Sequence, residues 1–271
     1  MNQKSRKSFL LFLRSVREVF SFFFFLGKRA RKTKFFFLLS FLPILLAMII
    51  KFNKIFSERG NLDEMYIFSN IIILVYLQFL ILILALFFGT SVCSEEVEGK
   101  TLTYLSTRPV SKSAVVLGKY AGYTLLVVLM VSLGVVFSFL ILNVDHLLRF
   151  SLYKILLRDV GVLTLGVICY TAFFTFLGTL MKKSILFGLV FCFGWENVIQ
   201  YFPGSTQRFA IAHYLKSLLP YVETRGRFSF LTFRLEPTRP GLAVLALFLI
   251  TAFFLGLAFL LFSQKEYILE D

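Results

Sequence analysis

The sequence predicts an all-α integral membrane protein, with six transmembrane helices preceded by an N-terminal interfacial helix. Of its 271 residues 58% are hydrophobic and only 16% are charged, whereas soluble globular domains average about 45–50% apolar residues. The apolar residues also form long continuous runs, and a helix needs about 20 of them to cross a bilayer. Membrane β-barrels instead show segments of roughly 10 residues with alternating hydrophobicity.

Four runs carry no charge over the length of a full span, namely Met65–Ser94, Tyr120–Val144, Val160–Met181 and Gly241–Gln264. Two further runs are weaker. The run 35–50 is short for a span, although Lys34 and Lys51 can snorkel at its two ends. The run 184–202 contains one acidic residue. We count both as spans of a domain over residues 35–264. The expected spans are about 35–51, 67–92, 120–143, 160–181, 184–202 and 241–263.

An even number of spans places both termini on one side of the membrane. Ten of the 29 Lys and Arg residues lie in the first 34 residues, and cytoplasmic flanks are rich in these residue types. We therefore expect both termini, segment 94–112 and the tail 265–271 in the cytoplasm. Residues 203–240 then form an outer-face loop. Its stretch TQRFAIAHYLKSLL is amphipathic, and fits a helix on the outer leaflet over a cavity or an ordinary packed loop helix.

The formal net charge is +14, but the basic residues flank apolar runs, which points to orientation and lipid headgroups and not to nucleic acid. Residues 1–34 have a helical pattern typical of an interfacial helix. Its apolar face is Phe9, Phe12, Leu13, Val16, Val19, Phe20 and Phe23, and its polar face includes Arg14, Arg17 and Glu18. We expect anionic headgroups at Lys28, Arg29, Arg31 and Lys32; the alternative is a disordered basic leader.

The stretch SEEVEGKTLTYLSTRPVSKSAVVLGKY interrupts the apolar chain, and its Gly99-Lys100-Thr101 resembles the end of a phosphate-binding loop. That motif needs a glycine where Ser94 stands, and it follows a strand and not a membrane helix. We therefore predict no nucleotide site, no cofactor and no enzyme activity in this chain. We find no catalytic constellation or metal-ligand spacing. We expect Cys93, Cys169 and Cys192 to be small hydrophobic side chains.

Segment 94–112 fits a short helix at the membrane surface. Ser94 can cap it, and Glu95, Glu96 and Glu98 would lie in the first turns, where the helix dipole favours anions. Pro109 would end this helix at Arg108, and the next helix would begin at Ser111. A helix placed in this way is tied rigidly to the second and third spans, so a push on it would move them.

These residues carry a resemblance. The pattern Glu95-Glu96-x-Glu98-Gly99-x-Thr101-Leu102, then Leu105-Ser106-x-Arg108-Pro109-Val110-Ser111, then Leu117-Gly118-Lys119 resembles the ABC-2 type permeases. It is most similar to the six-span permeases named for multicopper enzyme maturation. Here Lys100 separates Gly99 from Thr101, which are commonly adjacent, and Lys112 stands where many relatives have Arg.

The resemblance implies that the segment is a coupling helix that docks on a separate cytoplasmic ABC ATPase subunit of a prokaryotic cell membrane. It also implies a second permease copy or paralogue, and export as the direction. The contact set would be Glu95, Glu96, Glu98, Gly99, Thr101, Leu102, Leu105, Arg108 and Pro109. A stand-alone secondary transporter and a membrane-anchored sensor without transport are the alternatives.

Inside the membrane Glu196 is the one acid within an expected span, and such residues usually face a cavity or a partner. With Asn197 and Gln200 it could line a polar vestibule or pair across a dimer. Alternatively, the span ends early and Glu196 is interfacial. Earlier in the chain, at the start of the third span, Gly118 and Gly122 have the spacing that allows close packing of helices.

Overall fold

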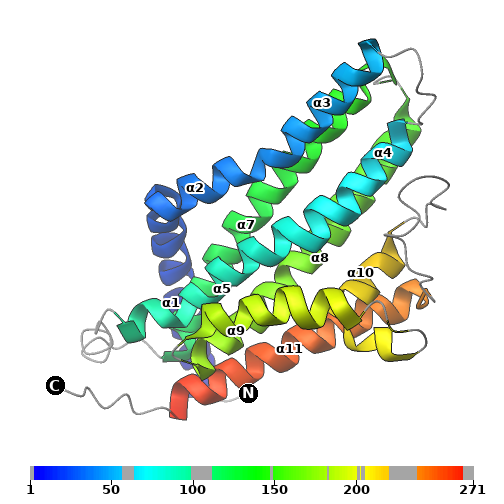
Figure 1. Cartoon of the computed structure of the whole chain (residues 1–271). Helices are drawn as coiled ribbons and strands as arrows, with labels where there is room; N and C mark the ends of the chain where they lie inside the picture. Colours follow the sequence, from blue (N-terminus) through cyan, green and yellow to red (C-terminus); the bar gives the residue numbers. More distant parts are fainter. Residues whose placement is uncertain are drawn as a thin grey trace.

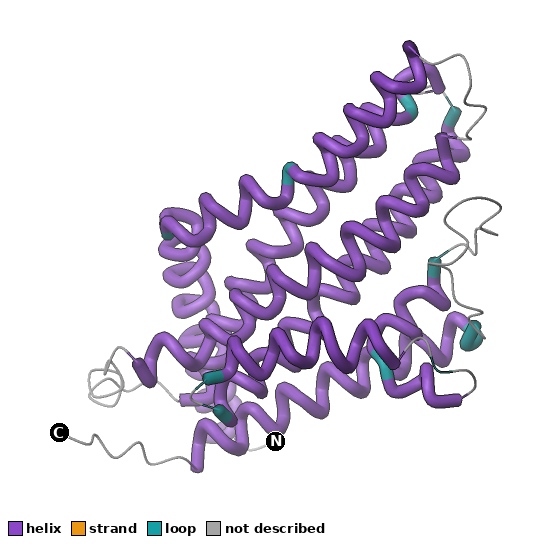
Figure 2. Tube along the Cα trace, in the orientation of Figure 1, coloured by secondary structure: helices purple, strands orange, loops and turns teal. Residues whose placement is uncertain are grey.

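The structure, a computed structural model, describes residues 3–56, 64–98, 112–146, 149–181, 183–199, 202, 205–219 and 237–264. Every regular element in these ranges is helical, as Figure 2 shows. The all-α class that the apolar runs predict is therefore confirmed for the described part of the chain.

The chain starts with three helices separated by two breaks. Helix α1 (Gln3–Arg29) ends where Ala30 adopts an extended conformation, and α2 (Arg31–Ser40) leaves in a new direction (Figure 1). Helix α3 (Leu42–Phe56) follows almost directly. Pro43 has no backbone N–H to donate to the preceding turn. The break at Phe41, whose N–H donates to the Leu38 carbonyl oxygen, is next to this proline.

The middle of the chain forms three long antiparallel runs. The first is α4 (Glu64–Asn70), the π-helical η1 (Ile71–Leu80) and α5 (Ile81–Glu98). The second is α7 (Lys112–Leu142), which leads to the single turn η2 (Val144–His146), and the third is α8 (Phe150–Leu180). Helices α5, α7 and α8 contact one another and supply most of the buried core.

The last third of the chain contains shorter elements and one long helix. Helix α9 (Ser184–Val190) continues into the π-helical η3 (Phe191–Glu196). The turn η5 (Ser205–Phe209) and helix α10 (Ile211–Leu218) come next. Helix α11 (Pro240–Gln264) packs chiefly on α8 and leaves residues such as Leu242, Phe248 and Phe253 exposed.

Five helical runs in the described part of the chain are long and apolar enough to cross a membrane, namely Arg31–Phe52, Ile67–Cys93, Ser113–Leu142, Phe150–Leu180 and Pro240–Phe262. Each overlaps an expected span. The fifth expected span, residues 184–202, corresponds to the shorter apolar helix Ser184–Glu196. The run at α8 begins ten residues earlier than expected, because Lys154, Arg158 and Asp159 lie on the helix and do not end it.

The ends of these helices segregate. Figure 1 shows the last turns of α5 and α11 at one end of the bundle, together with the start of α7. The end of α3 and the starts of α4 and α8 lie at the opposite end. The end of α5, the start of α7 and the end of α11 are therefore at the same end of the bundle.

Helix α1 packs along the first half of α7. A Cβ atom on Gly118 would lie 2.6 Å from Val19 Cγ1, and one on Gly122 would lie 3.3 Å from the Phe20 carbonyl oxygen. The predicted role of these two glycines in close helix packing is confirmed, with α1 as the partner. The other side of α1 exposes Phe22, Phe25 and Leu26, so apolar residues cover two faces of this helix.

Candidate functional site

The predicted docking segment begins at the end of α5. The helix runs without a break through Ser94 to Glu98, so the expectation that Ser94 caps a new helix is wrong. Glu95, Glu96 and Glu98 belong to its last turns, where the helix dipole does not favour anions. The physical reason is that no glycine or proline lies between Ser94 and Glu98 to break the helix. The remaining predicted contact residues, from Gly99 to Pro109, lie outside the described residues, and so does Ser111; α7 begins at Lys112.

Helix α5 is joined to α8 by a seam of small residues near the segment. A Cβ atom on Gly178 would lie 2.7 Å from the Thr90 carbonyl oxygen, and one on Gly89 would lie 2.9 Å from the Thr171 carbonyl oxygen. Thr175 Oγ1 donates a hydrogen bond of 3.3 Å to the Gly89 carbonyl oxygen. The two backbones are therefore in direct contact, which makes relative sliding of α5 and α8 costly.

Two lysines near the cytoplasmic end expected for the bundle contact aromatic rings; Lys32 is half-buried and Lys119 is buried. Lys32, expected among lipid headgroups, donates a hydrogen bond of 3.1 Å to Ser91 Oγ and lies over the rings of Phe88 and Tyr123. Lys119, near the start of α7, is buried, with Nζ 4.6 Å from the centre of the Phe23 ring. Aromatic faces attract such cations. Lys28, Arg29 and Arg31 are exposed and stay candidates for headgroup contact.

Glu196 is fully buried. Its Oε1 accepts a hydrogen bond of 2.5 Å from the Tyr170 hydroxyl of α8 and one of 2.6 Å from the backbone N–H of Ala212 in α10. The carboxylate therefore joins three segments that are distant in sequence. Glu196 is therefore not an exposed interfacial residue. The side chain of Asn197 makes a separate contact: its Nδ2 donates a hydrogen bond to the Cys192 carbonyl oxygen of its own helix. Gln200 lies outside the described residues.

The contact at Ala212 is a helix cap supplied from a distance. The first N–H groups of a helix need acceptors, and the N-cap residue Ala210 has no side chain that could serve. Glu196 provides one, at the positive end of the helix dipole. The two hydrogen bonds and the positive end of the helix dipole stabilise Oε1 of Glu196 in the interior.

Helix α10 is packed into the protein. Ile211, Ala212, His213 and Leu215 are buried, and the helix contacts α8 and α11. Of the two alternatives for this stretch, the packed loop helix is therefore the better description. Burial lowers the pKa of Lys216, which is near the end of α10, to about 8, and the nearby Glu196 carboxylate opposes that shift.

Two more hydrogen bonds join α10 to the residues before α11. His213 Nε2 lies 2.9 Å from Thr238 Oγ1. The backbone N–H of Thr238 donates a hydrogen bond of 3.2 Å to Ser217 Oγ. Helix α10 is thus held at its first turn by Glu196 and along its length by the start of the last span.

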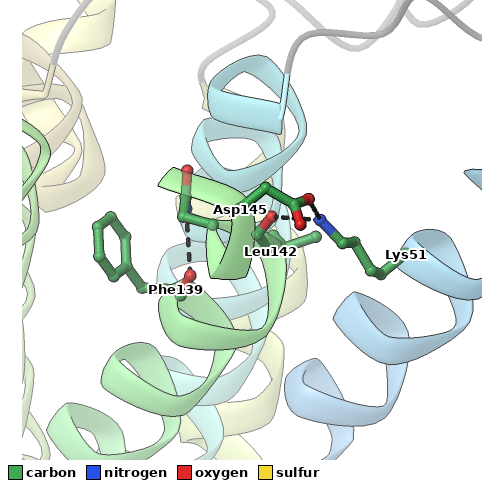
Figure 3. Close-up of polar contacts among 5 residues, drawn as sticks. Lys51, Phe139, Leu142 and Asp145 are labelled. Atoms are coloured by element: carbon green, nitrogen blue, oxygen red, sulfur yellow. Dashed lines mark hydrogen bonds and ion pairs between the residues drawn. The ribbon is translucent and has the colours of Figure 1, made fainter. Parts of the chain in front are cut away.

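The opposite end of the bundle is joined by an ion pair. Lys51 Nζ lies 2.5 Å from Asp145 Oδ2 and donates a hydrogen bond of 3.2 Å to the Leu142 carbonyl oxygen. Figure 3 shows how Lys51 of α3 reaches across to the end of α7, where Phe139 accepts a hydrogen bond from the Asn143 side chain. This contact links α3 and α7 near the points where the two helices end.

Comparison with protein families decides the class of this membrane protein. Residues 27–195, more than half of the chain, match the family described as ABC-2 family transporter protein. The chain belongs to this family. No curated protein sequence matches it. It is therefore a multi-pass membrane component of ABC-2 type, and membrane domains of this family typically lack an ATPase site and generally pair with ATPase subunits.

The matched region of the ABC-2 protein covers α2 to η3 and includes the seam between α5 and α8. It ends at Trp195, one residue before Glu196 and well before α10. The sequence pattern singled out Glu196 but not its partners. Tyr170 lies in an aromatic-rich span, where one tyrosine does not stand out. Near Ala212 the sequence offers one indication of a distant acceptor, a helix start without a capping side chain.

Proposed function

We propose that the chain is the membrane-spanning subunit of an ABC exporter, in which separate ATPase subunits hydrolyse ATP to move substrate toward the outer face. Two copies, or this chain and a paralogue, would combine with two ATPase subunits. Membership of the ABC-2 family supports this role. The motif from Glu95 to Ser111 favours the six-span subgroup named for multicopper enzyme maturation. The helix Ser184–Glu196 would then belong to the fifth span.

In this proposal segment 94–112 docks on the ATPase. One observation carries it: α5 leads into the segment and α7 leads out of it, at the same end of the bundle as the last turn of α11. Both helices are fixed in the core, α5 through its seam with α8 and α7 through α1. A force that reaches the end of α5 or the start of α7 would therefore be passed to the helices packed against them.

Co-purification tests the docking. The tagged full-length chain is purified from its native membrane, and an ABC ATPase is identified by mass spectrometry of peptides that contain the phosphate-binding loop. One variant changes Glu95, Glu96 and Glu98 to Lys. A matched control changes Glu266, Glu270 and Asp271 of the tail to Lys, which gives the same change in charge on the same expected side.

We expect the unmodified chain and the tail control to retain the ATPase, and the segment variant to lose at least about tenfold, since each buried or tightly paired interfacial charge contributes a kcal/mol or more. A chain that binds no ATPase contradicts the proposal and favours a secondary transporter. A complex that forms but shows no ATP-dependent conformational change favours a sensor.

A further inference from the structure

Three segments of the chain meet at one oxygen atom of Glu196. Tyr170 of α8 and Ala212 of α10 donate to the same Oε1 of Glu196, at 2.5 and 2.6 Å. Tyr170 and Glu196 are fully buried, and Ala212 nearly so. Hydrogen bonds that water does not reach are stronger than exposed ones.

The α8 side of this junction is connected to the expected docking end. Thr171, which follows Tyr170, has its carbonyl oxygen against Gly89 of α5, and Gly178 two turns later has no room for a Cβ atom beside Thr90. Helix α5 ends in the carboxylates of segment 94–112. Because α5 and α8 are in backbone contact, a displacement of α5 carries α8, and with it the Tyr170 hydroxyl.

The α10 side of the junction leads elsewhere. Helix α10 is eight residues long and has no capping side chain of its own. Its first turn is positioned by Glu196, and its later residues bind Thr238 just before α11. A displacement of the first turn of α10 would therefore also displace the residues at the start of α11.

We propose that Tyr170 and Glu196 are positioning residues that make α10 follow α8, so that a displacement that starts at α5 is delivered to α10 and the start of α11. This proposal rests on the proposed function, because ATP would supply the displacement. The linkage between α8 and α10 does not depend on which substrate is transported, because it is a mechanical property of the chain.

Spin-label distances in the full complex, with its ATPase subunits in lipid nanodiscs, test the linkage. The native cysteines are buried, so labels go to introduced ones at exposed positions. One pair, Leu157→Cys on α8 and Ile49→Cys on α3, reports the movement of α8. The second pair, Leu157→Cys and Phe209→Cys, reports whether the chain just before α10 follows α8.

In the unmodified background we expect ATP to change the Leu157–Ile49 distance and to leave the Leu157–Phe209 distance unchanged. Tyr170→Phe removes only the hydroxyl and leaves Glu196 on Ala212. In this variant ATP should still change the Leu157–Ile49 distance. The Leu157–Phe209 distance should now shift, or its distribution should broaden, when ATP is added.

Two variants serve as controls. Tyr120→Phe removes a comparable bond, the 2.9 Å hydrogen bond from the Tyr120 hydroxyl to the Ile168 carbonyl oxygen of α8, which does not involve α10. Glu196→Gln keeps an oxygen that accepts both hydrogen bonds. We expect both variants to give the same two distances as the unmodified chain. If loss of any hydrogen bond to α8 simply loosened that helix, Tyr120→Phe would instead behave like Tyr170→Phe.

The outcomes are distinguishable. If ATP leaves the Leu157–Ile49 distance unchanged in the unmodified complex, the proposed function fails. If that distance changes but the Leu157–Phe209 distance changes as well, α10 does not follow α8 and the linkage is refuted. It is also refuted if Tyr170→Phe and Tyr120→Phe give the same result.

Discussion

Gly178 of α8 lies directly against the backbone of Thr90 in α5: a Cβ atom added to the glycine would be 2.7 Å from the Thr90 carbonyl oxygen. Gly178→Ala should therefore force the two helices apart. Overpacking of this kind typically costs about 1–3 kcal/mol. We expect a lower unfolding temperature in detergent.

Gly161 provides the matched control, because it lies in the same helix with nothing within 4 Å of an added Cβ atom. Gly161→Ala should be neutral or should stabilise the protein by up to about 1 kcal/mol, the helix-propensity difference. Equal unfolding temperatures for the two variants would show that the seam is not tightly packed.

Glu196→Ala should loosen the start of α10. The change removes the acceptor of the Tyr170 hydroxyl and of the Ala212 N–H, and each buried donor that loses its partner costs about 1–3 kcal/mol. Hydrogen exchange of a peptide that covers residues 210–215 should become at least about fivefold faster, which corresponds to about 1 kcal/mol.

Glu196→Gln is the companion variant, because the amide oxygen can replace Oε1 in both hydrogen bonds. Exchange over residues 210–215 should then stay within about twofold to threefold of the unmodified chain, less than the loss of a cap would cause. Similar fast exchange in both variants would mean that the negative charge, and not the acceptor, holds the helix.

Asp145→Ala should have a small effect on stability. The carboxylate of Asp145 is exposed although Lys51 is mostly shielded, and exposed ion pairs contribute about 0–1 kcal/mol. Lys51 also keeps its hydrogen bond to the Leu142 carbonyl oxygen. Lys51→Ala removes both contacts and should cost more, so thermal unfolding of the two variants should rank in that order.

Gly118→Val should displace α1 from α7. A Cβ atom at this position already falls 2.6 Å from Val19 Cγ1 and 3.0 Å from the Phe20 backbone nitrogen, and the branched side chain would fill more of this space. Limited proteolysis of the intact protein in nanodiscs should cleave within α1 several times faster. Gly256→Val on α11, which has no neighbour within 4 Å, should leave the cleavage unchanged.

The membrane class, five of the expected runs and the packing of Gly118 and Gly122 follow from apolar periodicity and small-residue spacing, which are local signals. The start of α8 does not, because Arg158 and Asp159 look like loop residues in the sequence. In the fold they continue the helix, with the Asp159 side chain buried. A count of charges cannot tell a polar turn from a polar stretch of helix.

The surroundings of Lys32, Lys119 and Glu196 also depend on tertiary structure. Each lysine is placed over aromatic rings from other helices, and the acid meets partners 26 and 16 residues away. The error at Ser94 has a different origin, because a good capping residue that continues a helix already formed does not start a new one. Only Gly99 interrupts the helical pattern there.

Cysteine cross-linking tests the central claim, that segment 94–112 is the contact with an ATPase subunit. Single cysteines are introduced at Glu96 and Leu105 in the segment, and at Arg227 in the loop expected on the outer face, and the complex is treated with a short thiol-to-amine cross-linker. We expect covalent adducts with the ATPase from the two segment positions and none from Arg227. Adducts from Arg227 alone, or an ATPase that stays bound with no adduct from the segment, would contradict it.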